Sequence, residues 1–166
     1  MQIVLNGRAA IVTGGSKGIG FAIATRFAAS GADVAIIARG REALDRAVET
    51  IGKATKTRII GIQGDVAIPA DLERAYGEAM RAFGKIDILV NNAGTSRTGA
   101  FEEVTDEIWR QDFDEKLFAA IRVTRLVGRS SRSGAGAASS TSSTSALRRR
   151  DRRARPRRSP VPPAWR

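Results

Sequence analysis

One stretch decides the fold of this chain: Thr13-Gly14-Gly15-Ser16-Lys17-Gly18-Ile19-Gly20. It follows an apolar run at residues 9–12, Ala-Ala-Ile-Val, which predicts a strand. Behind the glycines, Ile19, Ile23 and Phe27 recur every four residues, which is the spacing of a helix. The predicted order is therefore a strand, a glycine-rich turn and a helix.

The glycines of this turn have separate physical roles. Gly14 lets the chain double back in a backbone region that is closed to residues with a Cβ. Gly18 and Gly20 carry no side chain, so a ligand and the neighbouring strand can approach the start of the helix. The free N–H groups and the positive end of the helix dipole then face an anion such as a phosphate or pyrophosphate. The alternative is a glycine-rich turn that holds no ligand.

The spacing distinguishes between the known phosphate loops. A P-loop needs Gly-Lys followed by Ser or Thr, whereas here Lys17 precedes Gly18 and no hydroxyl follows it. The G-x-G-x-x-G fingerprint does not match either. What remains, T-G-x-x-x-G-x-G, resembles the glycine motif of the short-chain dehydrogenase/reductase family. The resemblance implies a Rossmann-like domain that binds NAD(H) or NADP(H), with Gly14, Gly15, Ser16, Lys17, Gly18, Ile19 and Gly20 at the cofactor.

Length and composition limit the other possibilities. The 166 residues suit one domain, or one domain with a tail. The absence of Cys and His excludes disulfides, thiolate metal sites and the commonest general base, so we expect no metal site. No apolar run approaches the length of a membrane span, and the first residues do not resemble a signal peptide. We therefore expect a cytoplasmic protein without membrane partners.

Charge divides the chain into two parts. Its net charge is +11, but residues 128–166 alone hold eleven Arg and one Asp. Residues 1–127 hold 17 basic and 16 acidic residues and are nearly neutral. The sequence therefore predicts a folded unit at 1–127 and a disordered, basic, Ser/Arg/Pro-rich tail at 128–166.

Strand and helix patterns alternate through the first part. We predict strands at residues 9–12, 33–38, 58–63 and 86–90. Helices are predicted after the glycine turn, from 41 to about 53, from Pro69 to Gly84, and from Thr105, as N-cap, to about Val127. This alternation predicts an α/β fold with a doubly wound parallel sheet. The resemblance implies that the sheet is Rossmann-like and incomplete, because family members have further strands. Ligands bind such sheets beyond the carboxyl ends of the strands, where the glycine turn, Arg39, Asp65-Val66 and residues 91–94 all fall.

Arg39 bears on the choice of nucleotide. It lies just past the second strand, where the adenosine ribose of a dinucleotide would rest. An acidic residue there favours NAD, whereas a basic one can meet a 2′-phosphate. Residues 38–40 include no acid, and Lys17 adds a second positive charge. The pair predicts NADP(H) over NAD(H); the alternative is two solvated surface cations.

Two further segments match the family. Asp65-Val66 resembles its adenine-contact pair, in which the carboxylate accepts from the exocyclic amine and the apolar side chain packs on the ring. The alternative is an Asp that ends a strand and caps the next turn. Asn91-Asn92-Ala93-Gly94 resembles a second family motif, in which an Asn ties the fourth strand to its neighbours and meets the cofactor ribose. Ala93 and Gly94 would leave space on the nicotinamide side, although such a turn can also occur without a function.

The resemblance covers the cofactor-binding half and is to 3-oxoacyl-[acyl-carrier-protein] reductase-like members. The family transfers hydride between a nicotinamide and a carbonyl or alcohol, using a Tyr, a Lys four residues later, a Ser and a relay Asn. Here the only Tyr is Tyr76, and no Lys occurs after Lys116, which occupies the relay-Asn position counted from Trp109. We therefore assign no catalytic residue and expect this chain to be inactive as written.

The tail suggests an explanation for this loss. We hypothesise that it is a frame-shifted reading of the family's own gene. If the serines of residues 138–145 use TCN codons, reading one base earlier turns each Ser into Phe, Leu, Ile or Val, and each Thr into Tyr, His, Asn or Asp. The result has the form Arg-Ile-Ile-Asn-Val-Leu-Asn-Ile, which is the expected buried fifth strand.

Three functions compete at this stage. The first is a family oxidoreductase acting on an unidentified small molecule. The second is a catalytically silent cofactor-binding protein. The third is a polyanion or nucleic-acid binder that uses the Arg-rich tail, but no specific nucleic acid is expected because the tail has one aromatic residue, Trp165, and no recognisable module. Family members form homo-oligomers through helices that are partly absent here.

Overall fold

The computed structural model describes residues 3–95, 101–130 and 138–141. Helices and strands alternate along the chain, as the sequence predicts. In order they are β1 (Ala9–Thr13), α1 (Gly18–Ala29), β2 (Asp33–Ala38), α2 (Arg41–Ala54), β3 (Ile59–Gln63), α3 (Pro69–Phe83), β4 (Ile88–Asn91), the 3₁₀ turn η1 (Phe101–Glu103), α4 (Asp106–Phe113), the π turn η2 (Asp114–Phe118), α5 (Ala119–Ser130) and β5 (Ala138–Thr141).

The strands form one parallel sheet in the order β3-β2-β1-β4-β5. In the centre, Ile11 pairs with Ala35 on one side and Leu89 on the other. Because the strands are parallel, all of them end at one edge, here called the carboxyl edge, and begin at the opposite amino edge. The predicted α/β, Rossmann-like sheet is confirmed.

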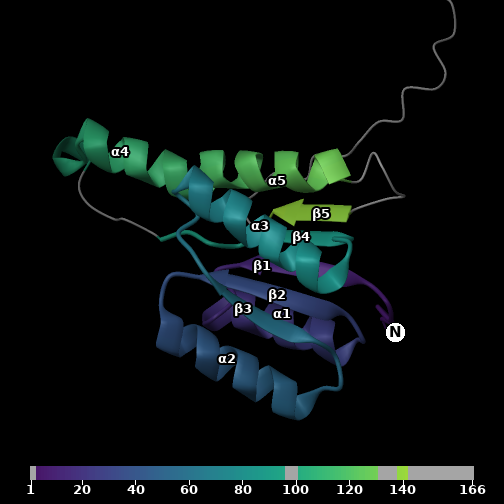
Figure 1. Cartoon of the computed structure of the whole chain (residues 1–166). Coiled ribbons are helices and arrows are strands. Elements are labelled where there is room, and N and C mark those ends of the chain that lie inside the picture. Colours follow the sequence, from purple (N-terminus) through teal and green to yellow (C-terminus); the bar gives the residue numbers. More distant parts are fainter. Residues whose placement is uncertain (1–2, 96–100, 131–137, 142–166) are drawn as a thin grey trace, which may run out of the picture.

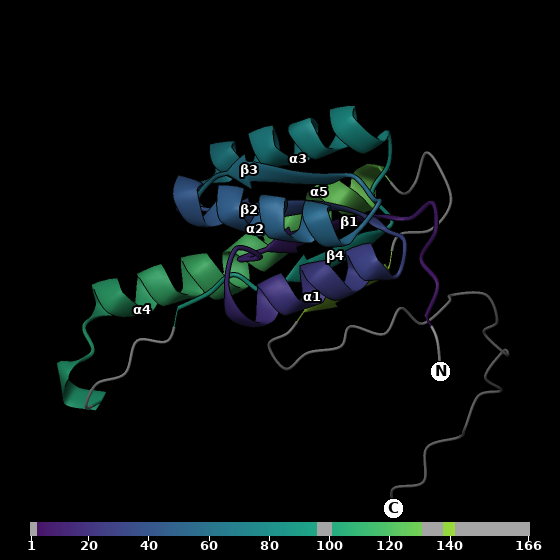
Figure 2. The same cartoon turned by 90° about the horizontal axis from the view of Figure 1, so that it is seen from below.

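Helices cover both faces of the sheet. Helices α3 and α5 lie on one face, and α1 and α2 lie on the other (Figures 1 and 2). Alternate residues of β1 therefore enter different cores: Ile11 packs with the α3 and α5 side chains, and Val12 packs with those of α1 and α2. Both are fully buried, and burial on both faces explains why this strand is apolar from Ala9 to Val12.

Helix α1 rests on the sheet through small residues. Gly20, Ala24 and Ala28 are its buried positions. Ile23 and Phe27 of the predicted apolar pattern lie partly buried at the margin, and Ile19 is 72% exposed. The helix predicted from the apolar spacing forms, but its buried positions are the residues that immediately follow Ile19, Ile23 and Phe27.

Several helix ends differ from the sequence prediction in detail. Gly84 ends α3 with φ 75°, as expected for a glycine C-cap. Thr105 is the N-cap of α4, but its side chain makes no capping hydrogen bond. The single helix predicted from there to Val127 is instead interrupted by η2, and α4 projects beyond the sheet (Figure 1).

Two short parts of the tail predicted from residue 128 have regular backbone structure, and the boundary between residues 127 and 128 stays a prediction. Helix α5 continues to Ser130, and Ala138–Thr141 forms β5, paired with β4 from Ile88 to Asn91. Strand pairing uses backbone N–H and C=O groups, so a Ser/Thr segment can extend a parallel sheet without supplying an apolar pattern. The rest of the predicted tail lies outside the described residues.

Candidate functional site

A groove of about 320 Å³ lies at the carboxyl edge of the sheet. Four segments meet there: the glycine turn and the ends of β2, β3 and β4. Eight of the residues predicted to bind a cofactor line it, namely Gly14, Ser16, Lys17, Arg39, Asp65, Val66, Ala93 and Gly94. Thus segments far apart in the sequence are brought together as expected.

The first turn of α1 follows directly on the groove residues Ser16 and Lys17. Lys17 is the N-cap in extended conformation and makes no side-chain capping bond, and the first turn contains no Asp or Glu. The first N–H groups of a helix have no partner within it, and they carry the positive end of the dipole. At Gly18, with φ 54°, an added Cβ would meet nothing within 4 Å. The turn therefore offers donors, positive charge and room to an anion.

The other glycines shape the turn itself. Gly14 has φ 67°, and a Cβ there would lie 2.8 Å from Ala93 Cα. A Cβ on Gly15 would lie 2.7 Å from Ile36 Cγ2. A Cβ on Gly20 would collide with Asn92 Nδ2 and the Gly14 carbonyl. Of the predicted cofactor residues, Gly15, Gly18, Ile19, Gly20 and Asn92 do not line the groove.

Asn92 fastens the end of β4 to the glycine turn. Its Nδ2 donates to the carbonyl oxygens of Thr13 and Gly14, each at 3.2 Å. Thr13 Oγ1 in turn accepts from the backbone N–H of Asn92 at 3.0 Å and of Ala93 at 3.1 Å, and donates to Val90 O at 3.3 Å. The predicted tie is present, and Thr13, which the sequence analysis assigned no role, forms its other half.

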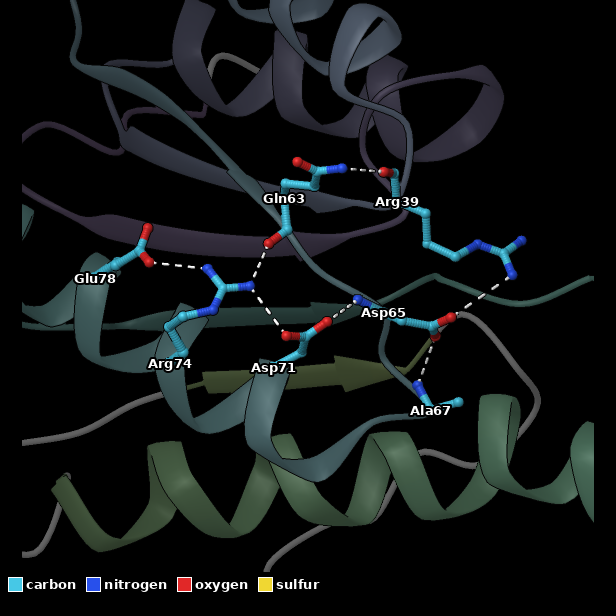
Figure 3. Close-up of polar contacts among 7 residues, drawn as sticks. All are labelled: Arg39, Gln63, Asp65, Ala67, Asp71, Arg74 and Glu78. Atoms are coloured by element: carbon cyan, nitrogen blue, oxygen red, sulfur yellow. Dashed lines mark hydrogen bonds and ion pairs between the residues drawn. The ribbon is translucent and has the colours of Figure 1, made fainter.

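Arg39 and Asp65 face each other across the groove lining. Arg39 Nη1 lies 3.9 Å from Asp65 Oδ2 (Figure 3). Asp65 Oδ1 accepts from the N–H of Ala67 at 2.9 Å, so this carboxylate also caps the turn after β3. Lys17 has no ion-pair partner within the described parts of the chain. The side chains of Lys17 and Arg39 are thus exposed to solvent, and the long ion pair with Asp65 restrains Arg39 only weakly.

A second layer of polar contacts holds the loop that carries Asp65 (Figure 3). The Asp65 N–H donates to Asp71 Oδ2 at 2.9 Å, and this bond, with the Arg74 guanidinium, lowers the pKa of the Asp71 carboxyl. Arg74 also donates to the Gln63 carbonyl at 2.6 Å, and Gln63 Nε2 donates to the Arg39 carbonyl at 3.0 Å. No motif in the sequence marked these contacts, because they join side chains to backbone groups of other segments.

The end of the groove beyond Gly94 differs from the family pattern. Thr95 Oγ1 donates to Glu115 at 2.7 Å, and both residues line the groove. Lys116, at the expected relay-Asn position, pairs with Asp112 at 2.6 Å and lies in the π turn η2. Its Cγ is 3.4 Å from where a Gly94 Cβ would stand. Tyr76 belongs to α3, where it packs against the hydrophobic core and does not line the groove.

Two other kinds of site are not found. Across residues 3–95, 101–130 and 138–141, no three acidic side chains cluster closely enough to hold a metal ion. None of the helices described there has both the length and the apolar character needed to cross a bilayer.

The model of the short chain dehydrogenase family matches residues 8–154. The chain belongs to that family. Among curated relatives, dehydrogenase/reductase SDR family member 4 of Caenorhabditis elegans is 38% identical over 122 residues, which are 73% of this chain and 47% of the relative. The chain spans about half the length of the curated relatives it matches.

Two solved structures share this architecture. L-sorbose reductase of Gluconobacter frateurii, complexed with NADPH and L-sorbose, matches with a TM-score of 0.81 and 33% identity over 85% of this chain and 54% of its own. A short chain dehydrogenase of Burkholderia cenocepacia, in complex with NADP, matches with a TM-score of 0.73 and 40% identity, over 76% of this chain and 51% of its own.

Proposed function

We propose that the groove binds a nicotinamide dinucleotide, with NADP(H) preferred over NAD(H). The observation that carries this proposal is the meeting of the glycine turn, Arg39, Asp65-Val66 and Ala93-Gly94 in one groove at the carboxyl edge. A glycine-rich turn that holds no ligand would need only the first of these segments. The two structural neighbours named above, solved with NADPH and NADP, support the choice of nucleotide.

Each lining segment suits a different part of such a nucleotide. The open N–H groups at Gly18 would hold the pyrophosphate. Lys17 and Arg39 would meet the 2′-phosphate, and Asp65 and Val66 would contact the adenine. Among the remaining predicted residues, Gly15 and Gly20 shape the turn, Ile19 flanks it, and Asn92 holds the nicotinamide-side strand end, where Ala93 and Gly94 leave space.

We infer that the ancestral activity is hydride transfer between a nicotinamide and a carbonyl or alcohol substrate. A bound nicotinamide cofactor would supply or accept the hydride. The chain has no Tyr-x-x-x-Lys pair beyond Gly94, and Lys116 stands at the relay-Asn position. A tyrosine needs a neighbouring cation to act as a base near neutral pH, since its ordinary pKa is about 10. We therefore propose cofactor binding without turnover.

The likeness to 3-oxoacyl-[acyl-carrier-protein] reductases is a finer proposal. One relative, a putative ketoacyl reductase of Streptomyces violaceoruber, is 39% identical over 71% of this chain and 43% of its own length. The groove lining described above contains cofactor-side residues, so the substrate class itself is left unassigned.

A titration of the full chain with NADPH tests the proposal. We expect saturable binding of one NADPH per chain and no reduction of added carbonyl compounds. Lys17→Glu should weaken binding, whereas Lys56→Glu, the same charge change on an exposed residue between α2 and β3, should not. Absence of saturable binding would refute the cofactor assignment, and robust carbonyl reductase activity would refute the catalytic part.

We also propose that residues 128–166 are a frame-shifted continuation of the family's domain. The segment that pairs with β4 is Ala138–Thr141, which begins the stretch that the shifted frame turns into an apolar strand. The nucleotide sequence across and beyond this region is the test. We expect the alternative frame to encode a Tyr-x-x-x-Lys motif and further strands, and a frame without them would end the hypothesis.

A further inference from the structure

We propose that Asp65 is a specificity-determining residue that weakens the preference for a 2′-phosphorylated nucleotide by competing for Arg39. This inference rests on the proposed function, because it concerns the nucleotide groove. It assigns the Asp65 carboxylate a role beyond contact with the adenine amine. The starting observation is that the predicted phosphate-binding cation and the predicted adenine-binding carboxylate are ion-pair partners (Figure 3).

The pair is loose and accessible. Its N–O separation is 3.9 Å, and the side chains are 60% (Arg39) and 29% (Asp65) exposed. Both residues also line the groove. An exposed ion pair at this separation is weak, so a ligand that offers a stronger anion can take the guanidinium away.

The two partners are held very differently. Asp65 is fixed on both sides, because its Oδ1 accepts from the Ala67 N–H and its own N–H donates to Asp71, which Arg74 holds in turn. For Arg39 the fixed part is the backbone carbonyl, which accepts from Gln63. Within the described residues, the guanidinium has the Asp65 carboxylate as its ion-pair partner. The cation can therefore move, while the carboxylate stays.

This asymmetry has a consequence for nucleotide choice. A 2′-phosphate that approaches Arg39 must draw the guanidinium from Asp65, and it comes close to a fixed negative charge as it does so. Both effects oppose binding. A nucleotide with a free 2′-hydroxyl brings no such charge. Asp65 therefore offsets part of the advantage that Arg39 and Lys17 give to a 2′-phosphorylated nucleotide.

Two adenosine fragments test this on the full chain: 2′,5′-ADP carries the extra phosphate and 5′-AMP does not. Asp65→Asn keeps the oxygen that caps Ala67 but removes the charge. We expect it to raise the ratio of 2′,5′-ADP affinity to 5′-AMP affinity about two- to fivefold, because any change in the adenine contact of Asp65 acts on both fragments alike. Asp45→Asn, which removes the same charge from the Arg41 ion pair of 2.9 Å on α2, is the matched control and should leave this ratio unchanged.

An Arg39→Ala background shows whether the effect passes through Arg39. There the gain from Asp65→Asn should shrink, since no guanidinium remains to be competed for. An unchanged ratio in the Asp65→Asn variant, or an undiminished rise of the ratio without Arg39, would each overturn this inference alone. If the unmodified chain bound neither fragment, the proposed function would fall and this inference with it.

Discussion

The two edges of the sheet are built in opposite ways. At the amino edge, charged side chains are paired within the protein. Asp87 accepts from Arg8 and from the Ala9 N–H, both at 2.9 Å, and Arg58 donates to Asp33 at 2.6 Å and 2.9 Å. The carboxyl edge instead has the glycine turn, a helix whose first turn contains no acidic residue, and the exposed side chains of Lys17 and Arg39.

The difference indicates which edge serves stability and which serves a ligand. Asp87 is buried and its contacts join β4 to β1, so its partners are all internal. The Arg58 guanidinium also lies 5.2 Å from the Phe83 ring and donates to the Ala82 carbonyl, which joins α3 to the same edge. A change at the amino edge should therefore lower stability, and a change among the groove side chains should alter nucleotide affinity.

The largest effect is expected where the carboxyl edge is closed to any side chain. Gly20→Ala should lower the free energy of unfolding by about 3 kcal/mol, because its Cβ would collide with Asn92 and with backbone at Gly14. Gly52→Ala is the control: it lies in α2 with no atom within 4 Å of the added Cβ, and should stabilise by about 0.5–1 kcal/mol. Urea unfolding measures both, and equal stability of the two variants would contradict the geometry.

The next effect separates the two edges directly. Asp87→Ala should lower the free energy of unfolding by about 2 kcal/mol, because it leaves the buried Ala9 N–H without its acceptor. It should leave NADPH affinity unchanged under conditions where the variant is folded. Thermal unfolding and an NADPH titration on the same sample check both parts. A loss of affinity without a loss of stability would erase the distinction between the edges.

Acid should lower the stability of the amino edge through Asp87. Burial raises the pKa of Asp87, but the hydrogen bonds from Ala9 and Arg8 and the nearby Lys85 together lower it by more. The pKa therefore lies below its ordinary value. The stabilisation is therefore present above the unfolded pKa of about 3.9 and is lost as pH falls through the lower, folded pKa. Between pH 5 and acid unfolding, Asp87→Asn should lose less stability than the unmodified chain; parallel curves would contradict this.

The smallest effect is expected at the groove cations. Arg39→Asp should reduce affinity for NADPH about tenfold, because it replaces a cation with an anion beside the 2′-phosphate. Affinity for NADH should fall much less, and the free energy of unfolding should be unchanged. Competitive titration with both nucleotides gives the ratio. An unchanged ratio would remove Arg39 from the account of cofactor preference.

Local patterns were enough to predict most of this fold. Apolar runs located β1 to β4, and Pro69 and Gly84 marked the ends of α3, because these signals act over a few residues. The groove could be predicted because parallel strands end at a common edge. Strand β5 could not be predicted from the residues as written, since Ala138–Thr141 has no apolar alternation and its pairing with β4 is a backbone contact between distant segments. Only the frame-shift hypothesis placed a strand in this stretch.

The supporting contacts of the site were also beyond local patterns. Thr13 and Asn92 meet only once β1 and β4 are neighbours. The Asp71 carboxylate belongs to the first turn of α3, and nothing in that helix indicates that it accepts from Asp65. Ile19 fits a helical apolar pattern but is exposed, because small residues bring α1 against the sheet.

The most direct test of the central claim is a map of backbone amide shifts in the full chain as NADPH is added. We predict that the shifts concentrate at the carboxyl edge, in residues 14–20, 39–40, 65–66 and 92–94, while Asp33, Arg58 and Asp87 at the amino edge stay unchanged. Shifts confined to the amino edge or to the arginine-rich residues after 147 would contradict the account.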